Sequence, residues 1–431
     1  MINWQTLTSE QQERFLMRPN TEDDAKLRTS VEEIIELVKD NGDDALKMLT
    51  LRYDGVEIDE FEVSEAEKTS AIKRLEPGVK AAIDRAYEMI TSFHAAQVQD
   101  DIKIETLPGV NCTLLIRPQQ AVGLYVPGGN TPLPSTALML GVPAKIAGCP
   151  KIVLTSPPGS NGQMAPEIIY AASKCGIDSL FKVGGAQAIA ALTWGTETIP
   201  AVNKIFGPGN RYVTEAKRRV SQIQGKVGID MPAGPSEVLV IADRTAKPSF
   251  VAADLLSQAE HGPDSQVILI SPDNSLILAV EAELKIQLKS LSRRKIAEKA
   301  LSNARFILAK DIDQAIDISN IYAPEHLIIN LEKAEQYLDQ VVNAGSIFLG
   351  PWSPESVGDY ASGTNHVLPT YGYARFTDAL SLKDFQKRST VQKLTREGLS
   401  SLSDTIMTIA QSEGLDAHTK SISLRLEEAA L

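Results

Sequence analysis

Hydrophobic residues recur at intervals of three or four positions through the first hundred residues of the chain. Ile83, Tyr87 and Ile90 are an example, within a region rich in charged residues. Such a period places apolar side chains on one face of an α-helix. The pattern therefore predicts amphipathic helices within 31–51 and 71–97.

From about residue 105 the pattern changes, because short β-rich runs now alternate with helical stretches. Strands are predicted at 121–126, 151–155 and 179–183, and helices near 135–146, 165–175 and 187–194. This alternation is typical of a parallel sheet covered by helices.

A second series of the same kind begins after Pro235. Strands are predicted at 237–242, 266–271, 305–309, 326–330 and 346–349, with helices near 250–261, up to about 304, 312–321 and 332–343. The tail from about 380 is predicted to be helical again. Two α/β units that meet near 235 are therefore expected, followed by a small separate lobe.

Composition narrows the class of protein. The chain has 431 residues, of which 43% are hydrophobic and 23% charged, as in globular proteins of two or three domains. Its net charge of -12 argues against nucleic acid and anionic membranes as partners. The sequence shows no secretory segment and no apolar run of membrane-spanning length. With three cysteines and no C-x-x-C pair, neither a disulfide framework nor a thiolate zinc site is expected. We expect a cytoplasmic location.

Three glycine turns follow predicted strands and lead into helices, at 127–130, 184–187 and 207–210. Glycine lets backbone N–H groups approach a phosphate, and a helix N-terminus favours its negative charge. None of the turns completes the G-x-G-x-x-G fingerprint, and each one could be only a tight connection. Together they indicate a nucleotide site if they lie at one edge of a parallel sheet.

Only five histidines are present, and four of them lie in the last 171 residues. Gln258 and His261 stand one turn apart at a predicted helix end that Gly262 and Pro263 terminate. This pair could supply two metal ligands or could be a polar helix end. The remaining histidine, His94, is interpreted as structural because it lies in an amphipathic helix.

Glu325 and His326 stand side by side just before a predicted strand. Their side chains are expected to diverge, which suits two proton-transfer roles better than chelation of one ion. Asp359 and His366 lie in an irregular stretch rich in Gly, Pro, Ser and Thr, a kind of loop that commonly carries function. His418, close to the end of the chain, could be a ligand or a solvated side chain.

Taken together, these motifs resemble the histidinol dehydrogenase family over nearly the whole chain. The strings that carry the resemblance are Phe-His-Ala-Ala-Gln at 93–97, Gly-Leu-Tyr-Val-Pro-Gly-Gly at 123–129, Val-Gly-Gly-Ala-Gln-Ala at 183–188, Ile-Phe-Gly-Pro-Gly-Asn at 205–210, Asp-Met-Pro-Ala-Gly-Pro-Ser-Glu at 230–237, Ser-Gln-Ala-Glu-His-Gly-Pro at 257–263, Ala-Pro-Glu-His-Leu at 323–327, Gly-Asp-Tyr-Ala-Ser-Gly-Thr-Asn-His at 358–366 and Ala-His at 417–418.

The resemblance implies an α/β fold of two incomplete Rossmann-like parallel-sheet domains with small helical N-terminal and C-terminal lobes. It implies oxidation of L-histidinol through L-histidinaldehyde to L-histidine, the last steps of histidine biosynthesis, with two NAD reduced and one Zn²⁺ per subunit. It also implies a domain-swapped homodimer in which His418 comes from the partner subunit. The domains expected are an N-terminal helical segment at 1–24, a substrate and zinc domain at 25–104 and 236–379, an NAD domain at 105–235 and a dimerisation lobe at 380–431.

The resemblance further assigns roles to individual residues. Zinc is expected at Gln258, His261, Asp359 and His418, with Glu325 and His326 as the catalytic base and acid. The substrate is expected to contact these four ligands and His326, together with Ser236, His366 and Glu413. NAD is expected at Tyr125, Gln187 and Asn210.

Three other functions remain open from the residues alone. A zinc hydrolase would bind no nucleotide, although the H-E-x-x-H pattern is absent. A thiolate aldehyde dehydrogenase would need a reactive cysteine, and only Cys175 adjoins a basic residue, Lys174. A non-catalytic metal- or nucleotide-binding protein would show no turnover at all.

Overall fold

Residues 1–18, 25–128, 132–231 and 234–428 are described by the computed structural model of the chain. They fall into two units: Met1–Gln97 with Gln119–Phe385, and Val98–Pro118 with Gln386–Leu431. The first unit contains two parallel sheets, so the predicted fold class of two Rossmann-like domains is confirmed.

Sheet A belongs to the second α/β series. It has six parallel strands in the order β1-β11-β10-β9-β12-β13. The strands are β1 (Ile2–Asn3), β9 (Glu237–Ala242), β10 (Gln266–Ser271), β11 (Arg305–Leu308), β12 (His326–Asn330) and β13 (Ser346–Leu349).

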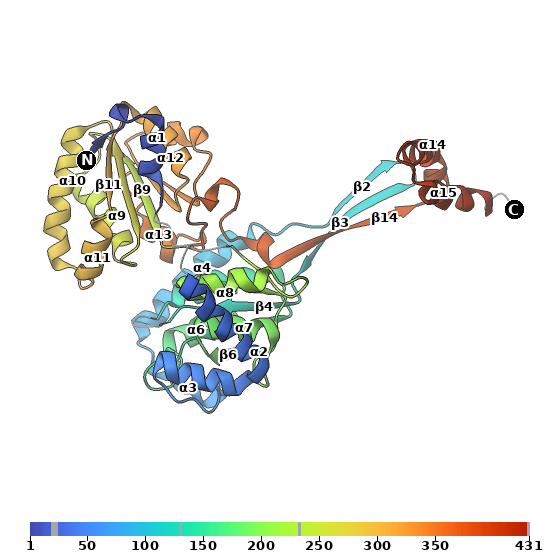
Figure 1. Ribbon diagram of the computed structural model, residues 1–431, viewed down its shortest axis with the longest axis horizontal. Helices are drawn as coiled ribbons and strands as arrows, with labels where there is room; N and C mark the ends of the chain where they lie inside the picture. Colours follow the sequence, from blue (N-terminus) through green and yellow to red (C-terminus); the bar gives the residue numbers. More distant parts are fainter. Residues whose placement is uncertain (19–24, 129–131, 232–233, 429–431) are drawn as a thin grey trace. The chain divides into compact units, whose positions relative to one another are not determined.

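Helices cover both faces of sheet A, which explains why its strands are continuous apolar runs. Successive side chains of a strand point to opposite faces, so Val238 and Val240 pack in one core while Leu239 and Ile241 pack in another. The helices that line the first core are α9 (Pro248–Ala259), α10 (Asn274–Gln287) and α11 (Arg294–Leu301), and those on the other face are α1 (Ser9–Leu16) and α12 (Ile312–Tyr322), as Figure 1 shows.

Sheet B belongs to the first series and repeats this strand order. Its five parallel strands run β6-β5-β4-β7-β8, so each series starts with a middle strand (β9 in sheet A, β4 in sheet B) and its strand order reverses beside that strand. The N-terminal β1 is an additional strand at the edge of sheet A. The strands are β4 (Ala121–Tyr125), β5 (Lys151–Ser156), β6 (Ser179–Lys182), β7 (Lys204–Phe206) and β8 (Gly228–Ile229), and the intervening helices are α5 (Pro134–Ala147), α6 (Pro166–Lys174), α7 (Gly185–Trp194) and α8 (Arg211–Ser221).

The N-terminal helices pack around sheet B. Helix α2 (Ala25–Asp54) contacts α7 and α8, α3 (Glu65–Arg74) contacts α6, and α4 (Pro77–Ala95) contacts α5. Residues 25–104 were expected in one domain with 236–379; the helices α2, α3 and α4 contact helices of the 105–235 segment, and the domain boundaries stay a prediction. Among the described helices, none is long and apolar enough to cross a bilayer.

The second unit contains an antiparallel sheet as well as helices. Strand β14 (Gln386–Leu394) and β2 (Ile102–Leu107) flank β3 (Val110–Pro118). Helices α14 (Arg396–Ser412) and α15 (Asp416–Glu428) complete the unit. The prediction of a helical tail from about 380 is therefore confirmed for α14 and α15, whereas Gln386–Leu394 form a strand. Most side chains of β2 and β14 are exposed, so no apolar alternation marked them as strands.

One further predicted element changes in detail, and three short strands were not predicted. The predicted helix at 332–343 is a 3-10 helix (Ala334–Gln340), and β1, β7 and β8 are strands of two or three residues. Strands this short have too few residues to show a sequence period. Their hydrogen bonds come from neighbours distant in the chain.

Candidate active site

Most of the chemically active side chains of the first unit gather at the amino ends of β9 and β12. These strands are adjacent and parallel, with His326 opposite Val238 in register. Glu237 begins β9 and His326 begins β12. Ligands of open α/β sheets usually bind at the carboxyl ends of strands, whereas this site lies at the amino ends of β9 and β12.

Glu325 and His326 are both buried, and both are oriented by backbone groups of the same residue, Glu237. The backbone N–H of Glu237 donates to Glu325 Oε2 (2.7 Å), and the carbonyl oxygen of Glu237 lies 3.0 Å from His326 Nδ1. A carbonyl oxygen can only accept, so Nδ1 carries the proton. This leaves Nε2 of neutral His326 as the basic atom, 3.6 Å from Asp359 Oδ1.

The two neighbouring side chains converge, contrary to the sequence expectation. Glu325 Oε2 lies 3.6 Å from His326 Nδ1. The expectation assumed an extended chain, whereas Glu325 occupies a bend ahead of β12. The pair therefore forms one coupled acid–base unit.

Two helices bring a second group of side chains to the same place. The end of α9 supplies Gln258 and His261, and the short helix α13 (Glu355–Tyr360) supplies Glu355 and Asp359 one turn apart. Ligand atoms of His261, Glu355 and Asp359 all lie within 4.8 Å of one another. His261 Nε2 is 3.9 Å from Asp359 Oδ2.

The Gln258 amide is satisfied at both ends in one orientation. Its nitrogen then donates to both carboxylate oxygens of Glu355, at 3.0 Å for Oε2, while its oxygen accepts from the Glu237 N–H at 3.1 Å. Glu355 therefore fixes which end of the amide faces which neighbour. The sequence interpretation missed Glu355, although its four-residue spacing from Asp359 places both on one helix face.

Burial and charge shift the acid–base groups strongly. Burial raises the pKa of Glu325 to about 8. For His326, burial favours the neutral ring, but Glu355, Glu325 and Asp359 together raise its pKa to about 10. Burial and neighbouring acids raise the pKa of Glu355 well above its usual range despite His326, whereas His326 lowers that of Asp359 despite burial.

These residues fit a divalent cation such as zinc. Imidazole nitrogen, carboxylate oxygen and amide oxygen are all acceptable zinc donors. Buried carboxylates repel each other unless a cation or protons compensate them, and among the ion pairs of the described residues Glu355 has no lysine or arginine partner. A cation would supply the missing positive charge.

The remaining predicted substrate residues are distributed over both units. His366 Nδ1 donates to the backbone oxygen of Asp359 (2.8 Å), and its Nε2 is 3.2 Å from Thr136 Oγ1. Ser236 directly precedes β9. Glu413 and His418 lie in the second unit, where both are exposed. Their roles stay predictions.

The glycine turns gather at the carboxyl edge of sheet B. Tyr125 ends β4, and its hydroxyl accepts the N–H of Gly185 (3.2 Å). Gln187 is buried in the first turn of α7, and Asn210 caps α8 by accepting from Tyr212 and Val213. Gly129 and Asn130 of the first turn, like Pro232 and Ala233 of the 230–237 motif, lie outside the described residues.

A buried ion pair braces the third turn. Lys217 pairs with Asp230, and both side chains are almost fully buried. Lys217 Nζ also donates to the carbonyl oxygen of Gly207 (2.8 Å), while Asp230 Oδ2 accepts the Gly207 N–H (2.7 Å). The backbone N–H and carbonyl of Gly207 are thus both hydrogen-bonded by this ion pair. The φ of 122° at Gly207 suits only glycine.

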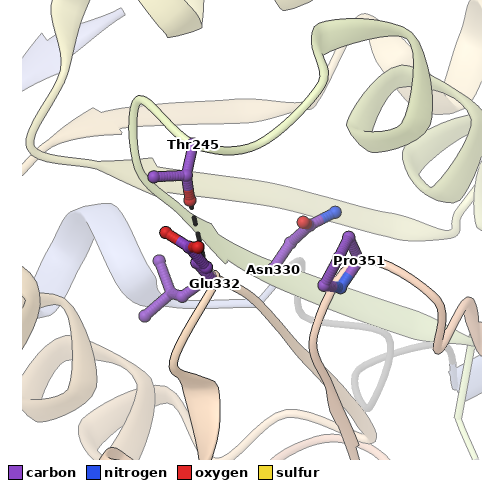
Figure 2. Close-up of a pocket in the computed structure, with 5 residues that line it drawn as sticks. Thr245, Asn330, Glu332 and Pro351 are labelled. Carbon is purple, nitrogen blue, oxygen red and sulfur yellow. Dashed lines mark hydrogen bonds between the residues drawn. The ribbon is translucent and has the colours of Figure 1, made fainter.

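A separate pocket opens at the carboxyl ends of β9 and β12. Thr245, Asn330, Glu332 and Pro351 line it, and the Glu332 N–H donates to Thr245 Oγ1 at 3.3 Å, as Figure 2 shows. Its volume is about 270 Å³. It lies at the opposite edge of sheet A from Glu325 and His326, so it is not part of the acid–base site.

The cysteines do not form a nucleophilic centre. Burial raises the pKa of Cys149 to about 11 and that of Cys175 to about 12. Cys112 lies in β3 of the second unit. Thiolates are the reactive form, so the structure gives no support to a thiolate mechanism at Cys149 or Cys175.

The fold and the site together define an α/β enzyme of the Rossmann-like class. The family model for histidinol dehydrogenase matches residues 17–426. Histidinol dehydrogenases of Colwellia psychrerythraea and Yersinia pestis are 56% and 54% identical, each over 99% of this chain and over 99% and 95% of their own lengths. The crystal structure of histidinol dehydrogenase from Elizabethkingia anophelis superimposes with a TM-score of 0.95 at 46% identity, covering 100% of this chain and 98% of that one.

The chain therefore belongs to the histidinol dehydrogenase family, which are oxidoreductases of histidine biosynthesis. The resemblance seen in the sequence motifs is confirmed.

Proposed function

We propose that this protein oxidises L-histidinol through L-histidinaldehyde to L-histidine and reduces two NAD. The observation that carries the proposal is the buried Glu325–His326 pair. His326 Nε2 faces Asp359, and Asp359 with His261 and Glu355 forms the proposed cation-binding group. Family membership supports the substrate. The composition of the chain agrees with a cytoplasmic location, which is part of the proposal.

The metal site in this proposal consists of Gln258, His261, Asp359 and His418, with one zinc per subunit. When bound there, zinc would supply a Lewis acid that orients the amine and imidazole nitrogens of histidinol. Glu355 holds the Gln258 amide, and His366 holds the Asp359 backbone. Ser236 and Glu413 complete the proposed contacts to the substrate.

In the first oxidation, His326 acts as the base. Its Nε2 takes the hydroxyl proton of histidinol while the carbinol carbon loses a hydride to NAD, so the C–O bond becomes a carbonyl. The Glu237 carbonyl keeps Nδ1 protonated throughout and stabilises the imidazolium that forms. A cation beside the acids would lower the pKa of His326 toward neutrality.

The second oxidation needs an oxygen atom from water. Glu325 takes one proton from a water molecule as the water oxygen adds to the aldehyde carbon. His326, protonated in the first oxidation, gives that proton to the carbonyl oxygen, so a neutral hydrate forms and His326 is a base again. The hydrate loses a hydride to a second NAD and a proton to His326, and the acid is formed. A carboxylate whose pKa is raised by burial is a stronger base than an exposed one.

NAD is assigned to Tyr125, Gln187 and Asn210 at the carboxyl edge of sheet B. The strand order of this sheet reverses between β4 and β7, and Tyr125 and the turn before Asn210 flank that point. Thr136 of α5, the helix that follows β4, contacts His366. This contact supports a short path between the nicotinamide and the substrate.

Loss of the Lys217–Asp230 ion pair, which holds the glycine turn at 207–210, is expected to weaken NAD binding. A Lys217→Met variant leaves Asp230 buried and uncompensated, which costs about 3–5 kcal/mol of stability, and frees the carbonyl of Gly207. We expect the KM for NAD to rise about tenfold, as steady-state kinetics at saturating histidinol would show. An Arg219→Gln variant on the same helix, which removes a partly buried charge that pairs with Glu215 instead of Asp230, should change this KM by less than about twofold.

The proposed homodimer is supported by apolar side chains exposed in the second unit. Ile102 and Ile104 of β2, Ile409 of α14 and Leu424 of α15 are each about half exposed or more. A two-layer unit of this size buries few residues, and exposed apolar clusters often mark an interface. We propose that a second copy covers this surface and that His418 is supplied across the dimer.

One assay tests the proposed function. Purified protein is incubated with L-histidinol and NAD, with and without a chelator, and NADH is counted per histidine formed. We expect two NADH per histidine, loss of turnover on chelation and recovery with zinc. Hydrolysis of amides or esters without NAD would favour the zinc hydrolase, and no turnover of either kind would favour a binding protein.

A further inference from the structure

A buried ion pair lies directly behind the catalytic residues and has no part in the proposed chemistry. Arg18 contacts both carboxylate oxygens of Glu237, through Nε to Oε1 and through Nη2 to Oε2 at 2.7 Å. The Glu237 side chain is fully buried, and that of Arg18 is 11% exposed. A charge pair at this depth is expensive to desolvate, so it contributes little stability by itself.

Arg18 also fixes the turn that leads into Glu325. Its Nη2 donates to the carbonyl oxygens of Tyr322 (3.0 Å) and Ala323 (3.2 Å), and its guanidinium lies 3.8 Å from the centre of the Tyr322 ring. Ala323 has a left-handed φ of 54°, which is strained for a residue with a side chain. The turn therefore depends on these contacts, two residues ahead of Glu325.

A second left-handed turn converges on the same pair. Tyr371, with a φ of 55°, donates its N–H to Glu237 Oε1 (3.1 Å). The next residue, Gly372, approaches so closely that an added Cβ would lie 3.1 Å from Arg18 Nη1. The Glu237 carboxylate thus connects three segments far apart in sequence.

The backbone of Glu237 connects this ion pair to the catalytic pair through two hydrogen bonds. Its N–H orients Glu325, and its carbonyl sets the tautomer of His326. A small shift of the Glu237 backbone would change both contacts at once. Hydrogen-bonded proton carriers lose rate steeply when they are displaced by less than 1 Å.

We propose that Arg18 is a positioning residue for the catalytic pair. By joining the Glu237 carboxylate to the carbonyls of Tyr322 and Ala323, it aligns the starts of β9 and β12 and so orients Glu325 and His326. The inference rests on the proposed function, because it assigns Arg18 to the same proton transfers. Arginine is required because a lysine ammonium cannot reach the carboxylate in bidentate fashion and both carbonyls together.

The test compares Arg18→Lys with Arg305→Lys. Arg305 holds the same N-terminal segment through the carbonyl oxygen of Met17 (2.6 Å), and no hydrogen bond joins it to Glu237 among the described residues. We expect Arg18→Lys to lower kcat about tenfold or more in both oxidations, with KM values within about threefold and full metal content. Arg305→Lys should keep kcat within about twofold. Equal losses in the two variants, or wild-type kcat in Arg18→Lys, would overturn the proposal.

A second variant answers the objection that Arg18→Lys only destabilises the fold. Arg18→Met combined with Glu237→Gln removes both charges and leaves none uncompensated in the interior. We expect its melting temperature to approach that of the wild type while kcat stays low. Recovery of kcat together with stability would show a merely structural role.

A readout independent of turnover separates this inference from the proposed function. With ¹⁵N-labelled histidine, NMR of the zinc-loaded protein, in which the cation lowers the pKa of His326, should report the Nδ1-protonated tautomer of its neutral ring in the wild type and a tautomer mixture in Arg18→Lys. An unchanged tautomer would contradict the positioning role, even if histidinol proved not to be the substrate. Absence of NADH formation by the wild type would instead contradict the proposed function.

Discussion

Replacing His261 by asparagine is expected to abolish both oxidations, with turnover reduced by about three orders of magnitude or more. His261 is the imidazole of the group in which His261, Glu355 and Asp359 place ligand atoms within 4.8 Å of one another. Without it, the proposed site keeps one nitrogen donor, His418, and its other donors are oxygens, which bind zinc less tightly than imidazole does. Loss of metal-assisted positioning alone is worth several kcal/mol, equivalent to this loss of rate.

The measurement is zinc per subunit by atomic absorption, together with NADH formed from histidinol and from the aldehyde supplied separately. Glu260→Gln is the matched control, because it removes a charge from the adjacent residue outside the cation-binding group. The control should keep its zinc and its turnover. Full zinc content in an inactive His261→Asn variant would move the role of His261 from metal binding to substrate contact.

A Glu325→Gln variant is expected to separate the two oxidations. Hydride transfer from histidinol needs the His326 base, so we expect the first step to fall by less than about tenfold. Water addition to the aldehyde needs a carboxylate, and loss of a general base costs about 10²–10⁴-fold. Glutamine keeps an oxygen that can accept the Glu237 N–H, so the backbone contact is preserved.

Single-turnover kinetics with histidinol and with histidinaldehyde would measure the two steps apart. Glu332→Gln, an exposed acid just beyond the other end of β12, is the control and should leave both rates unchanged. Histidinal should accumulate in the Glu325→Gln reaction and should be absent from the control. Equal losses in both steps would mean that Glu325 orients His326 rather than activating water.

These expectations depend on the close coupling of Glu325 and His326. Since both contact the backbone of Glu237, a change at one residue disturbs the other, and their proton affinities belong to the pair. The first-step rate in Glu325→Gln measures how large that disturbance is. The Arg18 variants test the same coupling by changing the contacts of the Glu237 carboxylate, while the Glu325→Gln variant changes the partner of its backbone N–H.

Much of the fold follows from local sequence pattern. The apolar runs of β9, β10 and β12 identify buried parallel strands, because helices on both faces leave no polar face to alternate. The three-residue and four-residue periods identify the longer helices. Local pattern failed where structure is held by distant partners, as in β14, whose exposed side chains give no period and whose hydrogen bonds come from β3.

The sequence by itself predicted the candidate acid–base and ligand residues and placed Gln258 and His261 about one turn apart at a helix end, because such local spacing follows from the helical period. Only the tertiary structure decided that Glu325 turns toward His326, that Glu355 joins the cation-binding group and that Arg18 lies behind Glu237. Glu237 and Glu325 are 88 residues apart, and Arg18 and Glu237 are 219 apart. Contacts over such separations arise from strand order and packing in the folded chain, which no local period encodes.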